Sequence, residues 1–319
     1  MYVCLTNRCH GRCDYCLEKQ WFFADGSRPV QDMSLSKFER ILDMGESEDR
    51  REGPQLELCG GEVLLYPQLE AALALARQKN VSVEMHTSLM GDTGYLAYLV
   101  GKYADSIKEW HINADYSYED RELFVANLWK IVNKCAFTLY CTLGPEISSV
   151  TKESDRITWL LESFTSDTKP EIAICTAVPF AGCSGKLYDF TEDIRTLISR
   201  VTSKHPAAFF YIQQPFCYCE INIDKLADIA NLKIFDSPSF CKHCDGMILP
   251  DGSYRWCPAF PEVVAYDIGE YKNFSQLGRK KEEYGEILNQ KIFFPQKCRE
   301  CEHFNPGKCF APCFAKLPL

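Results

Sequence analysis

The chain has 319 residues, 46% of them hydrophobic and 25% charged, with a formal net charge of −9. This composition is typical of a folded globular protein, and the acidic balance argues against a nucleic-acid partner. No apolar run reaches the ~18–20 residues of a membrane-spanning helix. No basic-then-apolar leader precedes the first strand-like run, so we expect a cytoplasmic protein with no membrane partner.

The number of cysteines points to metal. The sequence contains 18 of them, and disulfides are rare in the reducing cytosol. Metal binding is the usual reason for so many thiols in such a chain.

Short apolar runs alternate with amphipathic segments along the first two thirds of the chain, which predicts βα units and a parallel sheet. Residues also alternate in polarity within strands; for example, His111 and Asn113 share one face and Trp110 lies on the other. A polar inner face is typical of a barrel with an occupied lumen. Six units predict an α/β fold, an open (β/α)6 TIM-like partial barrel. The strands are expected at residues 2–6, 55–59, 81–88, 106–115, 136–143 and 171–178, and the helices at residues 34–45, 66–79, 93–103, 118–133, 152–164 and 191–203.

The last third of the chain has a different pattern. A strand-like run at residues 208–215 and a short helical piece at 223–231 lead into a segment rich in cysteine, proline and glycine. That segment contains a predicted hairpin, with its turn at Asp251-Gly252, and a predicted helix at 274–288. We expect a partial barrel, a bridging region and a smaller cysteine-rich α+β domain, at residues 1–205, 206–235 and 236–319.

Cys9, Cys13 and Cys16 follow the first predicted strand in the spacing C-x3-C-x2-C. Three thiolates on one tight loop can hold three irons of a [4Fe–4S] cluster. The fourth iron then keeps an open position, as catalytic metal sites do. A zinc site or three structural cysteines is the alternative, although zinc sites usually show paired C-x2-C units with a fourth ligand.

This spacing, with the aromatic Tyr15 just before Cys16, resembles the signature of the radical S-adenosylmethionine (SAM) enzymes. In that family the open iron takes the amino and carboxylate groups of SAM. The resemblance implies that the cluster reduces SAM and that a 5′-deoxyadenosyl radical then removes a hydrogen atom from a substrate C–H. An electron donor such as flavodoxin or ferredoxin is implied as a partner.

Gly60-Gly61-Glu62 directly follows the second predicted strand, at the end of a barrel strand where active sites gather. Glycines allow a backbone to approach a ligand closely, and a carboxylate or carbonyl there can accept from an ammonium group. In radical SAM enzymes the matching Gly-Gly-Glu-Pro stretch binds the amino group of SAM. Val63 replaces the proline here, which reduces loop stiffness but keeps the polar groups. Taken alone, the triplet would more often be a turn.

Further SAM contacts are implied at the ends of the later strands, where the family places its contacts to the ribose, the carboxylate and the adenine. An ordinary polar lining of the barrel is the alternative at each position. The residues are Thr87 and Ser88 after the third strand, Asn113 after the fourth, Thr142 after the fifth and Val178 after the sixth.

Seven more cysteines gather near the C-terminus in an order that resembles the SPASM extension of radical SAM enzymes, which holds auxiliary [4Fe–4S] clusters. Two features depart from that order: the spacing between Cys301 and Cys309 is longer by two residues, and the expected last cysteine is absent. The family's interleaved ligation implies one cluster on Cys241, Cys244, Cys257 and Cys313, and leaves Cys298, Cys301 and Cys309 for a second. A single cluster, as in the shortened twitch version, or structural zinc is the alternative.

The remaining eight cysteines are expected to be mostly small buried apolar residues. Cys183 follows the sixth strand in a glycine-containing loop that should border the cavity. It is therefore the first candidate for donating a hydrogen atom to a substrate radical.

Three functions stay open. Enzymes with this extension commonly crosslink or epimerise ribosomally made peptides, so a peptide maturase is the first hypothesis. Because the chain begins a few residues before the first strand, leader recognition would need a separate protein or the barrel rim. The second hypothesis is oxidation or epimerisation of a small molecule such as a sugar or aminocyclitol. The third is a non-catalytic iron–sulfur or zinc protein.

Overall fold

The computed structural model describes the chain at residues 1–10, 29–46, 55–115, 120–132, 134–144, 150–164, 170–176, 188–212, 221–234, 246–255, 265–280 and 283. These residues form two compact units. The first lies within Met1–Phe137 and Cys244–Tyr284, and the second within Thr138–His243. None of the described helices is long and apolar enough to cross a membrane.

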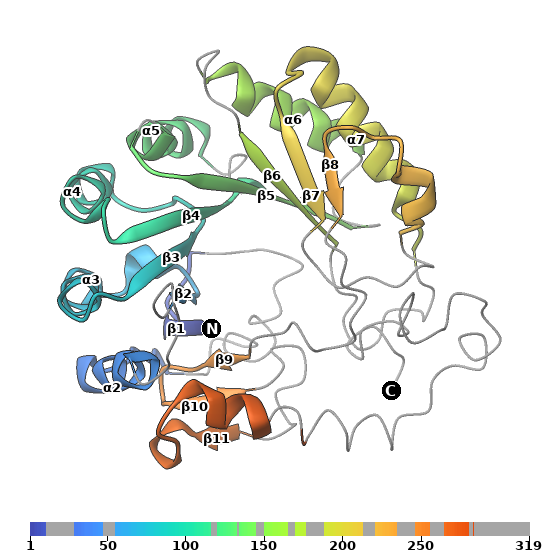
Figure 1. The fold of residues 1–319 in the computed structure, drawn as a ribbon. Coiled ribbons are helices and arrows are strands. Elements are labelled where there is room, and N and C mark those ends of the chain that lie inside the picture. Colours follow the sequence, from blue (N-terminus) through green and yellow to red (C-terminus); the bar gives the residue numbers. More distant parts are fainter. Residues whose placement is uncertain are drawn as a thin grey trace. The chain divides into compact units, whose positions relative to one another are not determined.

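The first unit contains four parallel strands, each of which pairs with the next one along the chain. A helix follows each strand, which is the βα alternation that the sequence predicts. Figure 1 shows these four helices in a row along one side of the strands. The strands are β1 (Tyr2–Thr6), β2 (Gln55–Gly60), β3 (Ser82–Thr87) and β4 (Ile107–Asn113), and the helices are α2 (Leu35–Glu46), α3 (Leu69–Gln78), α4 (Thr93–Tyr103) and α5 (Arg121–Val132).

The two faces of this sheet differ in polarity, as predicted. One face is completely buried; burying such a side chain stabilises the fold by ~1.5–3 kcal/mol relative to exposing it. It consists of Val3, Leu5, Leu56, Leu58, Val83, Met85, Trp110 and Ile112. The other face carries a row that the strand register defines, which we call the glutamate row: Tyr2, Glu57, Glu84 and Glu109 lie opposite one another on β1 to β4.

A hairpin from late in the sequence continues this sheet beyond β1. The short strand β9 (Met247–Ile248) pairs in parallel with β1, and β10 (Ser253–Arg255) and β11 (Ala265–Asp267) follow in antiparallel pairing. The predicted hairpin is thereby confirmed.

Helix α2 holds the hairpin and the turn that follows it in place. Lys37 Nζ donates a hydrogen bond to the carbonyl of Asp251 at 2.6 Å. Arg40 donates to the carbonyls of Gly269 and Tyr271, both at 3.0 Å. The position of β9 beside β1 is a long-range pairing that the sequence pattern did not predict.

The second unit repeats the same βα pattern. Its strands are parallel neighbours in chain order. Thr138 and Cys141 of its first strand are completely buried, and the hydroxyl of Tyr211 donates to Thr138 Oγ1 at 3.3 Å. The elements are β5 (Phe137–Leu143), α6 (Val150–Glu162), β6 (Glu171–Thr176), α7 (Thr191–Lys204), β7 (Phe209–Ile212), the 3-10 turn η3 (Ile223–Leu226) and β8 (Leu232–Ile234).

The structure corrects some boundaries. The second helix begins at Leu69 rather than at residue 66, because the 3-10 turn η1 (Val63–Leu65) comes first. The segment at 223–231 forms only η3, and the short strands β8 and β11 were not predicted. Within the predicted last helix, residues 274–280 and 283 are helical. The division into three domains stays a prediction.

Candidate functional site

The structure shows both ends of the first cysteine loop. Cys9 lies just after β1 and is half-buried. Cys13, Tyr15 and Cys16 lie outside the described residues. The chain returns at residues 29–33, beside β1, and an antiparallel bridge joins Thr6 to Asp32. The loop that carries the three cysteines is therefore closed at its base.

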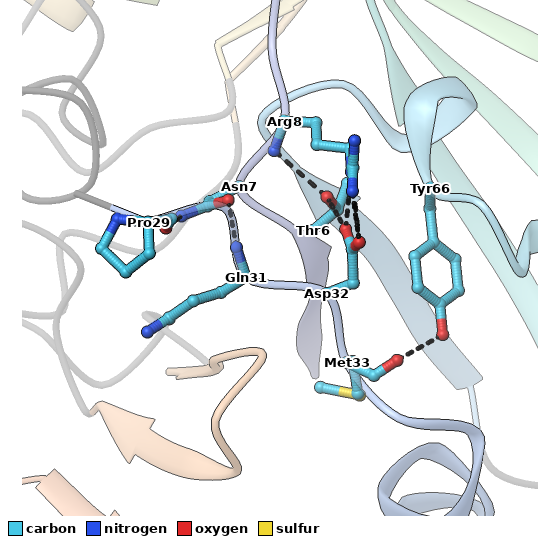
Figure 2. A network of polar contacts seen from close by, with 8 residues as sticks. All are labelled: Thr6, Asn7, Arg8, Pro29, Gln31, Asp32, Met33 and Tyr66. Atoms are coloured by element: carbon cyan, nitrogen blue, oxygen red, sulfur yellow. Dashed lines mark hydrogen bonds and ion pairs between the residues drawn. The ribbon is translucent and has the colours of Figure 1, made fainter. Parts of the chain in front are cut away.

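Hydrogen bonds from Asn7 join the two ends of the loop (Figure 2). The backbone N–H of Asn7 donates to the carbonyl of Gln31 at 3.0 Å. In return, the N–H of Gln31 donates to Asn7 Oδ1 at 2.7 Å, and the Asn7 side-chain amide donates to the carbonyl of Pro29 at 3.1 Å. These bonds fix the register between the two chain segments at the base of the loop.

An ion pair completes this arrangement. The Arg8 guanidinium forks onto Asp32, with Nε 3.1 Å from each carboxylate oxygen and Nη2 2.9 Å from Oδ2. The Thr6 hydroxyl donates to Asp32 Oδ1 at 2.6 Å. Burial alone would raise the pKa of Asp32, but the bonds from Arg8 and Thr6 hold that pKa below its usual range. We call Thr6, Asn7, Arg8, Pro29, Gln31 and Asp32 the loop clamp.

Tyr66 supports the clamp from the turn after β2. Its hydroxyl donates to the carbonyl of Met33 at 2.5 Å. Burial, together with the nearby charge of Asp32, raises the pKa of Tyr66 to about 12. The phenol therefore keeps its proton and remains a donor at neutral pH.

Gly60 and Gly61 allow the turn after β2 to lie directly against the chain that leads to Cys9. A Cβ on Gly60 would lie 2.4 Å from the carbonyl oxygen of Thr6, and one on Gly61 would lie 2.2 Å from that of Arg8. The N–H of Gly61 donates to the Thr6 carbonyl at 2.9 Å. Close packing thus requires both glycines, in addition to any contact with a cofactor.

Glu62 is buried at the same place and is 1% exposed. Its Oε1 accepts from the N–H of Leu64 at 3.1 Å and from the Thr87 hydroxyl at 2.7 Å. Its Oε2 accepts from the N–H of Ser88 at 2.7 Å and from the Ser88 hydroxyl. Buried polar oxygens need such donors, and these bonds tie the turn after β2 to the end of β3.

Three of the residues expected to bind SAM, Glu62, Thr87 and Ser88, are therefore in mutual contact. Sequence reasoning missed this structural role, since the spacing along the chain does not show which donors meet Glu62. Direct contact with SAM stays a prediction for them. Asn113 ends β4 and accepts from the N–H of Asp115 at 3.0 Å.

Thr142 lies in the second unit, on β5, and is 8% exposed. The other predicted site residues lie outside the described parts of the chain. These are Val178, the proposed hydrogen donor Cys183, and the C-terminal cysteines Cys241, Cys244, Cys257, Cys298, Cys301, Cys309 and Cys313.

Two carboxylate–imidazole pairs on the polar face were also missed. His86 Nε2 lies 3.0 Å from Glu57 Oε2, and His111 Nε2 lies 3.2 Å from Glu84 Oε2. The two imidazole rings stack at 4.4 Å. Burial lowers the pKa of His86. Burial would raise the pKa of Glu57, but the hydrogen bond with His86 lowers it. In β3 and in β4 a glutamate precedes a histidine by two residues. This spacing places both side chains on one face, so it is the sequence feature that could have predicted the pairs.

No protein-family model and no curated protein matches the chain. Solved structures do match. Streptococcus suis SuiB bound to S-adenosylmethionine is 16% identical, with a TM-score of 0.64 over 98% of this chain and 72% of that chain. SuiB bound to its precursor peptide SuiA gives 14% identity and a TM-score of 0.64 over 98% and 71%. The histidine-tagged anSMEcpe with bound AdoMet gives 12% identity and a TM-score of 0.57 over 100% and 88%.

At these identities the likeness establishes the fold. The chain is an α/β protein with a mostly parallel sheet, in the partial-barrel architecture of radical SAM enzymes. More particularly, it has the fold of SuiB and anSMEcpe. The resemblance expected from the Cys9, Cys13 and Cys16 spacing is thus confirmed at the level of the fold.

Proposed function

We propose that this protein is a radical SAM enzyme whose cluster is held by Cys9, Cys13 and Cys16. The observation that carries the proposal is the packing of Gly60 and Gly61 against the backbone that leads to Cys9. This packing supports the proposal because Gly60 and Gly61 lie some fifty residues further along the chain than Cys9, the first of the three proposed ligands.

The described residues are compatible with an iron–sulfur cluster bound at the cysteine loop. The glycine turn leaves no room for a Cβ toward the cysteine loop, and three thiolates are the usual donor set of a cluster with one open iron. With SAM bound there, the cofactors would supply one-electron cleavage of the sulfonium and a carbon radical. The loop clamp fixes the start of the loop, and Glu62 fixes the turn that faces it.

The C-terminal cysteines extend the proposal. Their order supports one or two auxiliary [4Fe–4S] clusters, with ligands from Cys241, Cys244, Cys257 and Cys313 and from Cys298, Cys301 and Cys309. Cys183 remains the candidate hydrogen donor. Flavodoxin or ferredoxin is the proposed electron donor, in a cytoplasmic setting that keeps the thiols reduced.

A ribosomally made peptide is the proposed substrate, and crosslinking or epimerisation is the proposed outcome. The support is the likeness to SuiB, which has been solved with its precursor peptide SuiA. Oxidation or epimerisation of a small molecule is the second candidate. The pair of His86 with Glu57 favours it, because an alcohol that is oxidised must also give up a proton to a base.

The release of 5′-deoxyadenosine tests the reaction class. Anaerobically reconstituted protein with SAM and dithionite should release it, and Cys13→Ala should abolish the release. Cys135→Ala is the matched control, because Cys135 is half-buried and lies outside the ligand motifs. Equal release from wild type and Cys13→Ala would contradict the proposal, and no release from wild type would favour a non-catalytic protein.

Mass spectrometry after turnover separates the two substrate classes. Candidate precursor peptides should show loss of hydrogen on crosslinking, or deuterium uptake from heavy water on epimerisation. Conversion of a sugar or aminocyclitol with no change in any peptide would favour the second candidate.

A further inference from the structure

A second group of metal-ligating side chains lies on the polar face of the first unit. Glu84 of β3 and Glu109 and His111 of β4 bring one ligand atom each to within 4.8 Å of one another. His111 Nε2 lies 3.2 Å from Glu84 Oε2 and 4.0 Å from Glu109 Oε2. The side chains of Glu84 and His111 are 9% and 7% exposed, and that of Glu109 is 26% exposed.

Strand pairing produces this convergence. Glu84 lies opposite Glu109 in the register of β3 and β4, and His86 lies opposite His111. Because alternate residues of a strand point to the same face, all four side chains share the polar face. The group therefore lies on paired strands and not on a loop, next to a shift in register between Val83 and Glu84.

The two oxygens of Glu84 have different surroundings. Gln55 donates to Oε1, and the Lys108 ammonium lies 3.9 Å from the same oxygen. Oε2 is the oxygen nearest to His111. Metal-binding carboxylates and imidazoles are commonly oriented by such outer contacts. Here the contacts from Gln55 and Lys108 hold the carboxylate with its second oxygen toward His111 and Glu109.

The His111 ring is oriented as well. It stacks on His86 with the ring centroids 4.4 Å apart and the planes 16° from parallel, and His86 is in turn held by Glu57 at 3.0 Å. A divalent cation between the two carboxylates and the imidazole would be attracted by both negative charges. This oriented imidazole and the arrangement at Glu84 are separate observations, and both favour a bound ion.

We propose that Glu84, Glu109 and His111 bind a divalent first-row cation such as Mn²⁺, Fe²⁺ or Zn²⁺. Carboxylate oxygens and imidazole nitrogen are the donors that suit these ions. Three protein ligands leave positions open for oxygen atoms of a bound molecule, as in catalytic metal sites. The site uses no thiolate, so it differs in chemistry from the cysteine loop and does not depend on the proposed radical reaction.

Mn²⁺ is the probe, because this hard cation prefers oxygen and nitrogen over the thiols of the chain. In cluster-loaded, unreduced protein, loss of the free Mn²⁺ signal in electron paramagnetic resonance should show one saturable site. Glu109→Gln and His111→Gln should each weaken binding by about 10–100-fold. The control Glu122→Gln removes the same charge from an exposed position in the first turn of α5, away from the ligands and their neighbours, and it should leave the affinity unchanged.

Thermal unfolding gives an independent readout. Saturating Mn²⁺ should raise the melting temperature of wild type, because a ligand of the native state stabilises it, but not that of Glu109→Gln. Glu109 is a quarter exposed, so this variant should fold. Absence of saturable Mn²⁺ binding in wild type, or equal binding in wild type and both ligand variants, would overturn the proposal and leave Glu84, Glu109 and His111 as a structural polar cluster of the sheet.

Discussion

Arg8 and Asp32 form a forked ion pair across the base of the cysteine loop, with Arg8 Nη2 2.9 Å from Asp32 Oδ2. Arg8 immediately precedes Cys9, whereas Asp32 lies on the chain that returns from the loop. The pair therefore fixes the distance between the two ends of a segment that carries three proposed cluster ligands.

Breaking this pair should impair the cluster more than the fold. In Asp32→Asn the fork loses its charge, but the backbone bonds of Asn7 and Gln31 remain. We expect a small decrease in melting temperature and a clear decrease in iron retained after desalting. The exposed pair Arg77–Asp105, broken by Asp105→Asn, is the control. Equal iron loss in both variants would show that the clamp has no specific role.

The clamp should also respond to acid. The pKa of Asp32 is lowered from its ordinary value of 3.8, so its contribution to stability is complete above that value. The contribution is lost as the pH falls through the lower native pKa. The difference in unfolding free energy between wild type and Asp32→Asn should be constant between about pH 5 and 7 and should shrink below about pH 4. Urea unfolding of cluster-free protein measures this difference in free energy. A difference that increases as the pH falls would contradict the prediction.

Gly61→Ala should be strongly destabilising, by about 1–3 kcal/mol. Its Cβ would lie 2.2 Å from the Arg8 carbonyl oxygen and 2.8 Å from Cys9 Cβ, so either the turn or the cysteine loop must move. Gly101→Ala is the matched control, because a Cβ there would meet no heavy atom within 4 Å apart from its chain neighbours and the backbone of its own helix. Within helix α4 that change should stabilise by about 0.4–1 kcal/mol. Urea unfolding compares the two, and equal effects would show that the close approach is unimportant.

Glu62→Gln should destabilise the protein even without a cofactor. The amide replaces one carboxylate oxygen with a donor, which then faces groups that are themselves donors, such as the N–H of Ser88. The expected cost is about 1–3 kcal/mol, measured by unfolding of cluster-free protein. Glu122→Gln in the first turn of α5 serves as the exposed control. If Glu62→Gln lost only SAM affinity at full stability, a role limited to the cofactor would be supported instead.

The local pattern of the sequence predicted the elements of the barrel well. Helix α4 has the predicted bounds, and the alternation of His111 and Trp110 in β4 correctly separated the two faces. Gly61 was also correctly placed after β2, whereas Gly60 is the last residue of that strand. These signals are local, because period and turn chemistry depend on near neighbours in the chain.

Pairings between distant residues could not be predicted in the same way. Nothing near Glu62 in the sequence shows that Thr87 and Ser88 supply its donors, and nothing near Arg8 indicates Asp32. Those contacts depend on strand register and on loop return, which only the folded chain decides. The row that contains Glu84 could have been found, because its glutamates occupy the same face of neighbouring predicted strands.

The pairing of β9 with β1 bears on the order of synthesis. Met247 lies opposite Tyr2. One edge of β1 therefore stays unpaired until β9, and with it most of the chain, has been synthesised. At about 5–20 residues per second, that wait is roughly 12–50 s. During this time the edge is an open template for another strand. Nascent chains of this protein should therefore depend on chaperones more than the short-range contacts of its barrel units would suggest.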